Sequence, residues 1–225
     1  MENKLKSGSE IVDELLEGGY DSNIITTIYG PAGSGKTTFC LLASIAIADS
    51  GKKVIFMDTE GGFSIRRFNQ LTDNKDLLNS IFILKPIDFF EQKKAIERLK
   101  NMMNEQIGLV VIDTIGYHYR IEMGKKHEIK QINNELGLQI SFLSEIARKY
   151  NIPVLLTNQV YSDFDEKSTI RIVGGDLLKY ASKCLMELQK GASGIRIAVV
   201  KKHRSIAEGK EIKFRLVEKG IGSIE

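Results

Sequence analysis

A glycine-rich motif near the amino terminus constrains this chain more than any other feature. Residues 30–37 read Gly-Pro-Ala-Gly-Ser-Gly-Lys-Thr, which fits the pattern G-x-x-x-x-G-K-[ST]. A β-branched apolar run at 24–29 precedes the motif, and a helix-forming run at 38–48 follows it. A strand, a glycine loop and a helix in this order place backbone N–H groups at a helix N-terminus, where they bind phosphate. The sequence therefore predicts a nucleotide-binding phosphate loop in an α/β fold.

The motif gives each of its positions a role. The loop N–H groups hold the α- and β-phosphates, the Lys36 ammonium reaches the β- and γ-phosphates, and the Thr37 hydroxyl binds Mg²⁺. We therefore expect a nucleoside triphosphate and Mg²⁺ as ligands. The predicted nucleotide-binding residues are Gly30, Pro31, Ala32, Gly33, Ser34, Gly35, Lys36, Thr37 and Thr38.

Composition is that of an ordinary globular protein. Of the 225 residues 42% are hydrophobic and 27% charged, and the formal net charge of +3 permits contact with nucleic acid without requiring it. The longest apolar run, around 39–48, is too short to span a bilayer, and the first residues lack the apolar core of a secretory signal. We expect a cytoplasmic protein that does not associate with membranes. Cys40 and Cys184 are expected to be small core residues in a reducing compartment.

Strand-like apolar runs alternate with helical stretches over most of the chain. Strands are expected at 24–29, 53–58, 80–84, 109–113 and 153–158, and helices at 38–48, 88–105 and 128–150. This alternation predicts a central, mostly parallel sheet flanked by helices. Three further strand-like runs, at 183–188, 194–200 and 211–217, have no helix between them and predict a C-terminal antiparallel β extension. No linker-like segment appears, so we expect residues 1–225 to form a single domain.

Three polar residues follow predicted strands and should lie at the same sheet edge as the phosphate loop. Asp113 ends a buried strand, which is the Walker B position of a second Mg²⁺ ligand. Glu60 follows the strand at 53–58 and could orient or deprotonate an attacking water, although a solvated turn acid fits the position equally well. Gln159 could sense the γ-phosphate, although its position alone favours a simple strand-end hydrogen bond.

A basic cluster, Lys-Lys-His-Arg at 201–204, lies in the C-terminal β region. It could contact DNA, or Lys202 and Arg204 could act in trans on the γ-phosphate of a neighbouring subunit. A solvated hairpin tip is the simplest alternative.

Four motifs follow the phosphate loop in a fixed order. They are Asp-Thr-Glu-Gly at 58–61, Val-Ile-Asp-Thr at 111–114, Thr-Asn-Gln-Val at 157–160 and Val-Gly-Gly at 173–175. With the phosphate loop, they resemble the RecA/RadA recombinase superfamily and, within it, the archaeal RadB group. The resemblance covers almost the full length and implies a RecA-like ATPase core that uses ATP and Mg²⁺. It implies that Lys36, Glu60 and Gln159 are catalytic.

The same resemblance implies an ATP-binding and DNA-binding protein of homologous recombination and DNA repair. It implies weak ATPase activity that is independent of DNA, and an accessory role without strand exchange. The implied partners are single-stranded or branched DNA read with little sequence preference, the main recombinase, a junction-processing nuclease and further copies of the chain. The candidate DNA contacts are Arg120, Lys125, Lys126, Lys130 and Arg171.

Three departures from full recombinases favour the accessory role. We expect the chain to consist of the ATPase core, without the helical DNA-binding lobe and linker motif of those proteins. The segment between Gln159 and Gly174 is short and acidic, which opposes contact with phosphate. Tyr180 stands where recombinases often have a histidine that couples nucleotide to DNA.

Two other functions stay open. The chain could be a nucleotide-gated binding module in which turnover is incidental. It could also be a RecA-fold regulatory ATPase of the circadian-clock type that acts on protein partners, although the motif at 157–160 argues against this reading.

Overall fold

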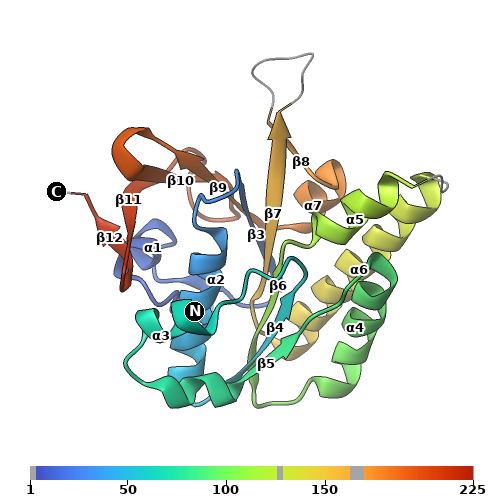
Figure 1. The fold of residues 1–225 in the computed structure, drawn as a ribbon, viewed down its shortest axis with the longest axis horizontal. Coiled ribbons are helices and arrows are strands. Elements are labelled where there is room, and N and C mark those ends of the chain that lie inside the picture. Colours follow the sequence, from blue (N-terminus) through green and yellow to red (C-terminus); the bar gives the residue numbers. More distant parts are fainter. Residues whose placement is uncertain (1–3, 126–128, 163–169, 225) are drawn as a thin grey trace.

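A ten-stranded sheet forms the centre of the molecule, and helices cover both of its faces (Figure 1). The computed structural model describes residues 4–125, 129–162 and 170–224. The strand order is β12-β11-β10-β9-β3-β7-β6-β4-β5, and β8 pairs with β7 beside this path. The strands of this sheet are β3 (Ile25–Gly30), β4 (Lys53–Asp58), β5 (Ile81–Leu84), β6 (Ile107–Asp113), β7 (Val154–Ser162), β8 (Ile170–Ile172), β9 (Cys184–Lys190), β10 (Ile195–Lys202), β11 (Glu211–Val217) and β12 (Gly220–Ser223). A separate antiparallel ribbon joins β1 (Lys4–Leu5) to β2 (Tyr20–Asp21).

The parallel core runs from β9 to β5 and is buried on both faces. Successive side chains of a strand point to opposite faces, so a strand covered on both sides must be apolar throughout. In β4, Val54 and Phe56 belong to one hydrophobic cluster, and Ile55 and Met57 belong to the other. This double burial explains the nearly continuous apolar runs of the sequence.

The helices divide between the two faces. The cluster that contains Phe214 is completed by α1 (Glu10–Leu15), α2 (Lys36–Asp49) and α3 (Ile65–Leu71). The opposite cluster is completed by α4 (Phe89–Met102), α5 (Gly116–Met123), α6 (Ile129–Tyr150) and α7 (Gly175–Ala181). Two short 3₁₀ turns, η1 (Lys75–Ser80) and η2 (Ala192–Gly194), lead into β5 and β10. Both cysteines are buried and free, as expected for core residues.

The predicted α/β fold with a C-terminal antiparallel extension is confirmed, but the extension begins one strand later than expected. β9 runs parallel to β3, with Thr26 opposite Cys184, and the antiparallel pairs start at β10. Parallel neighbours need a crossover element. Here α7 forms part of that crossover, and this short helix was not predicted. The glycine-containing strand β12 was also not predicted, because its strand propensity is low and its pairing with β11 stabilises it.

The ends of two elements, β7 and α4, differ most from the predicted boundaries. β7 continues past 158 to Ser162, since its last residues pair antiparallel with β8. α4 stops at Met102, short of 105, because Met103 has extended backbone. The Asn104 side chain then accepts the Gln106 N–H at 2.9 Å and fixes a turn.

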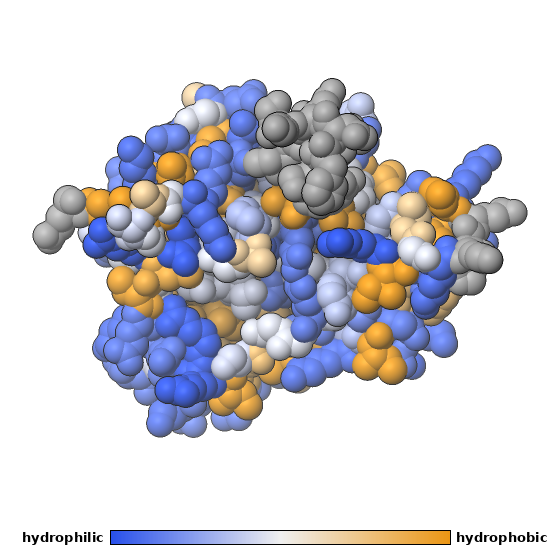
Figure 2. Space-filling model, turned by 45° about the horizontal axis from the view of Figure 1, so that its top comes forward, coloured by the Kyte–Doolittle hydropathy of each residue, from blue (hydrophilic) through white to orange (hydrophobic). Residues whose placement is uncertain are grey.

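The strands of the parallel core point toward one edge of the sheet, the edge at which β7 ends at the top of Figure 1. Figure 2 brings this side forward and shows mainly hydrophilic residues, interrupted by small hydrophobic patches. None of the described helices has both the length and the apolar composition that crossing a membrane requires.

Candidate functional site

The phosphate loop joins β3 to α2 at this edge. Gly33 and Gly35 have φ values of +70° and +109°, which residues with a side chain rarely adopt. A Cβ on Gly30 would lie 2.2 Å from the carbonyl oxygen of Leu188, so the loop also needs glycine for its close contact with β9. α2 begins at Lys36, and its unpaired N–H groups and the positive end of its dipole therefore adjoin the loop.

Lys36 is held inside the loop by backbone oxygens. Its Nζ donates to the carbonyl oxygens of Gly30 and Pro31, at 2.9 and 3.0 Å. The residue is only 7% exposed. Burial lowers the pKa of its ammonium group, while the negative charges of Asp113 and Glu60 oppose that shift. An anion in the loop would favour the charged form and offer it a stronger partner than the carbonyls.

A hydrogen-bonded set of three side chains marks the predicted metal position. Thr37 Oγ1 donates to Asp113 Oδ2 at 2.7 Å, and Thr157 Oγ1 donates to Asp113 Oδ1 at 2.5 Å. Burial raises the pKa of the Asp113 carboxyl, and the two hydroxyl groups lower it. Neighbouring hydroxyl and carboxylate oxygens are the kind of ligand that Mg²⁺ prefers. No group of three or more His, Cys, Asp or Glu side chains that could hold a metal ion occurs among the described residues.

The loop after β4 carries Glu60 into the same site. Both oxygens of the buried Asp58 carboxylate accept backbone N–H groups of this loop, from Gly62 at 2.8 Å and from Phe63 at 3.1 Å. Glu60 Oε1 accepts a hydrogen bond from Gln159 Nε2 at the end of the parallel part of β7. Two residues predicted separately, on different strands, are therefore in direct contact.

Removal of the Asp58 carboxylate is expected to loosen the loop that carries Glu60. In Asp58→Ala the N–H groups of Gly62 and Phe63 lose their acceptor, and an unsatisfied buried donor costs about 1–3 kcal/mol. We expect the free energy of unfolding to fall by about that amount in urea denaturation, and ATP hydrolysis to slow because Glu60 is no longer held. The exposed Asp49 is the matched control. If Asp58→Ala and Asp49→Ala have the same free energy of unfolding and the same rate of ATP hydrolysis, Asp58 does not anchor the loop.

The phosphate loop, Glu60 and Gln159 surround one cavity of about 350 Å³, a volume within the range of small-ligand sites. The structure thus brings the predicted catalytic residues together. The lining residues are Ala32, Gly33, Gly35, Lys36, Thr37, Thr38, Glu60, Thr114, Gln159 and Leu216. A second cavity of about 320 Å³ shares Glu60, Thr114 and Gln159 with the first and extends toward α5.

The predicted DNA contacts whose side chains the structure describes lie on α5, just after it and at the start of α6. Arg120 on α5 lines the second cavity and is exposed, and Lys130 at the start of α6 is exposed. Lys125 Nζ bonds the Glu122 carboxylate at 2.7 Å. Lys126 and the Arg171 side chain lie outside the described residues. DNA contact by this set stays a prediction.

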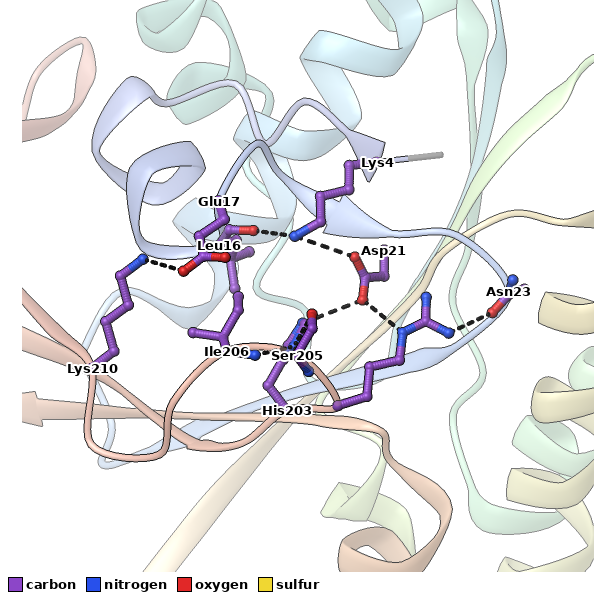
Figure 3. A network of polar contacts seen from close by, with 10 residues as sticks. Lys4, Leu16, Glu17, Asp21, Asn23, His203, Ser205, Ile206 and Lys210 are labelled. Carbon is purple, nitrogen blue, oxygen red and sulfur yellow. Dashed lines mark hydrogen bonds and ion pairs between the residues drawn. The ribbon is translucent and has the colours of Figure 1, made fainter. Parts of the chain in front are cut away.

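The buried Asp21 carboxylate lies in a network of polar contacts (Figure 3). Arg204 belongs to this network. Its Nε donates to Asp21 Oδ2 at 3.1 Å. His203 Nε2 lies 3.3 Å and the Lys4 ammonium 3.5 Å from oxygens of the same carboxylate, and burial lowers the pKa of the His203 imidazole. Lys202 Nζ donates to the Lys179 carbonyl oxygen at 2.7 Å. The Arg204 end of the cluster is therefore anchored in the fold.

This network and the phosphate loop lie at opposite ends of β3. Asp21 precedes β3, whereas the loop follows it. Arg204 therefore does not approach the phosphate loop of its own chain. Action of Lys202 and Arg204 on the nucleotide of a neighbouring chain stays a prediction.

Two residues that shape the site were not predicted as site residues. Asp58 had a detectable signal, because an aspartate at a strand end before two glycines is typical of a side chain that caps a turn. Thr157 had none. Its hydroxyl reaches Asp113 only because β7 lies beside β6, and hydrophobic periodicity does not encode strand order.

Comparison with known proteins decides the family. A protein-family model described as Rad51 matches residues 3–224. A protein of Methanobrevibacter smithii named DNA repair and recombination protein RadB is 40% identical over 218 residues, which cover 93% of this chain and 92% of that protein. This chain belongs to the Rad51 family, in its RadB branch. The RadB protein of Thermococcus sibiricus is 38% identical, with 98% and 96% of the two chains covered.

A solved structure agrees with this membership. The crystal structure of the RadB recombinase superposes with a TM-score of 0.84 at 38% identity, covering 98% of this chain and all of that one. The resemblance to the RecA/RadA superfamily and its RadB group is therefore confirmed. Membership of the Rad51 family favours a role in recombination over the clock-type alternative.

Proposed function

We infer that this RadB-branch chain binds ATP and DNA as an accessory protein of homologous recombination and DNA repair. Residues 1–225 would act as one ATPase core with weak hydrolysis and no strand exchange of its own. The observation that carries the proposal is the meeting of Lys36, Glu60 and Gln159 around one cavity at the phosphate loop. The RadB relatives, which are named DNA repair and recombination proteins, support the biological setting. The main recombinase, a junction-processing nuclease and further copies of the chain stay the expected protein partners.

Thr37 and Asp113 are the proposed Mg²⁺ ligands. Their oxygens are already 2.7 Å apart, and the Thr157 hydroxyl fixes the second carboxylate oxygen. Bound Mg²⁺ would neutralise charge on the ATP phosphates. Lys36 would add a second positive group to the same phosphates and would exchange its two carbonyl partners for phosphate oxygens.

Glu60 is the proposed orienter or general base for the attacking water. Its carboxylate accepts a hydrogen bond from Gln159, which fixes the orientation of the group beside the phosphate loop. Because the Gln159 amide can bond either Glu60 or a γ-phosphate, it could also report the state of the nucleotide to the rest of β7.

DNA binding by this chain is expected to weaken steeply with salt and to show little sequence preference, because the contacts are made to phosphates. Arg120→Ala and Lys130→Ala should each reduce the slope of log K against log salt concentration by about 0.7–0.9. Fluorescence anisotropy with single strands of unrelated sequence, and with a branched junction, measures both effects. Lys213→Ala, on exposed β11 surface, is the control. Salt-insensitive binding, or strong selection of one sequence, would contradict phosphate contact.

A further inference from the structure

Three side chains from the C-terminal strands meet the phosphate loop. Arg196 of β10 directs two guanidinium nitrogens at the Gly33 carbonyl oxygen, Nε at 3.3 Å and Nη2 at 3.2 Å. Lys190, at the end of β9, places its Nζ 3.3 Å from the position that a Cβ on Gly33 would occupy. Leu216 of β11 lies 3.2 Å from the corresponding position on Gly35 and lines the 350 Å³ cavity. None of the three belongs to the predicted site.

These side chains lie on the side of the loop away from the hydrolytic groups. In the sheet, β3 separates β7, β6 and β4 from β9, β10 and β11. Asp113, Glu60 and Gln159 belong to the first group of strands or to the loop that follows one of them. Lys190, Arg196 and Leu216 belong to the second group. A nucleotide whose γ-phosphate faces the hydrolytic groups would therefore present its other phosphates and its nucleoside to the C-terminal strands.

The charges suit this placement. No acidic side chain in the part of the chain that the structure describes forms an ion pair with Lys190 or Arg196. The ammonium groups of Lys36 and Lys190 and the guanidinium group of Arg196 all approach the phosphate loop. Like charges that converge on one loop repel unless an anion lies between them. A polyphosphate would supply that anion.

We propose that Lys190 is a nucleotide-binding residue that contacts the α- and β-phosphates of a nucleoside di- or triphosphate in the phosphate loop. Arg196 is a positioning residue that fixes the loop through the Gly33 carbonyl, and Leu216 packs against the nucleoside. The C-terminal antiparallel strands thus form the second wall of the site, within the same chain. This inference rests on the proposed ATP site and adds to it the residues that hold ADP and ATP equally.

Lys190→Ala tests the placement. ATP and ADP share the α- and β-phosphates, so loss of a contact to these phosphates should weaken the binding of both nucleotides. We expect ATP and ADP each to bind about tenfold more weakly. Calorimetric titration with each nucleotide measures the two affinities. Lys213→Ala makes the same charge change on β11 and should leave both unchanged.

Two outcomes would overturn this assignment. Unchanged affinity for both nucleotides would remove Lys190 from the site. Weaker ATP binding with unaltered ADP binding would place the ammonium at the γ-phosphate instead. If the unmodified chain binds neither nucleotide, the proposed ATP site itself is wrong. This result differs from the two outcomes above, in which the unmodified chain binds nucleotide.

Two substitutions, Arg196→Ala and the conservative Arg196→Lys, test the role of Arg196. Arg196→Ala should weaken ATP and ADP binding, because the Gly33 peptide loses its fixed donor. Arg196→Lys keeps one donor and should recover part of the lost affinity. The positioning role is wrong if Arg196→Ala binds both nucleotides as the unmodified chain does, or if Arg196→Lys recovers nothing.

Discussion

ATP hydrolysis is expected to fall by about 10²–10⁴-fold in Glu60→Gln, the usual contribution of a positioned general base. The substitution is nearly isosteric and removes the charge that polarises water. The amide oxygen can still accept the hydrogen bond that Glu60 Oε1 receives from Gln159. The loop itself is held by Asp58, which is untouched. ATP affinity should therefore stay the same, and the loss should appear in kcat.

Single-turnover and steady-state phosphate release measure this loss. Glu145→Gln is the control, because Glu145 is an exposed acid on α6 that is not part of the site. If Glu60→Gln hydrolyses ATP at the unmodified rate, Glu60 is only a turn acid. If binding alone is required for function, Glu60→Gln should still support DNA repair in cells, which would favour the nucleotide-gated binding module.

The second large effect is expected from Lys36→Ala. The variant removes a buried ammonium that is placed at the phosphate loop and held by the carbonyl oxygens of Gly30 and Pro31. A hydrogen bond to a charged group contributes about 1.5–3 kcal/mol. Its loss should raise the Kd for ATP about 10- to 150-fold. The shift in unfolding temperature that ATP produces in the unmodified chain should shrink accordingly.

The control for Lys36→Ala is Lys213→Ala, which makes the same charge change on exposed β11 surface. The unfolding temperature of Lys36→Ala without nucleotide shows that the variant is folded. An ATP-induced shift that stays the same in Lys36→Ala would mean that ATP does not bind at the phosphate loop.

The phosphate loop and the parallel sheet could be predicted because both depend on local patterns. A glycine motif between a strand and a helix specifies its own geometry, and strands buried on both faces appear as apolar runs. The sequence also predicts that Glu60, Asp113 and Gln159 lie at the same edge of the sheet, because parallel strands end at one edge. The contact between Glu60 and Gln159 and the bond between Thr37 and Asp113 agree with that expectation.

The rest depends on contacts between distant segments. Thr157 reaches Asp113, and Arg196 reaches Gly33, only because β7 adjoins β6 and the β9–β11 strands adjoin the loop. The short helix α7 was missed, so the parallel direction of β9 was missed with it. The anchoring of Arg204 by Asp21 joins residues from opposite ends of the chain. Periodicity does not carry information of this kind.

Calorimetric titration of the unmodified chain with ATP tests the proposed nucleotide site most directly. If the cavity beside the phosphate loop is the site, one ATP molecule should bind per chain. Chelation of Mg²⁺ should weaken ATP binding, because the ion that Thr37 and Asp113 hold next to the phosphates is removed. The same titration of Lys36→Ala should show the affinity loss given above. Absence of binding by the unmodified chain, or equal binding by Lys36→Ala, would contradict an ATP site built on Lys36, Thr37 and Asp113.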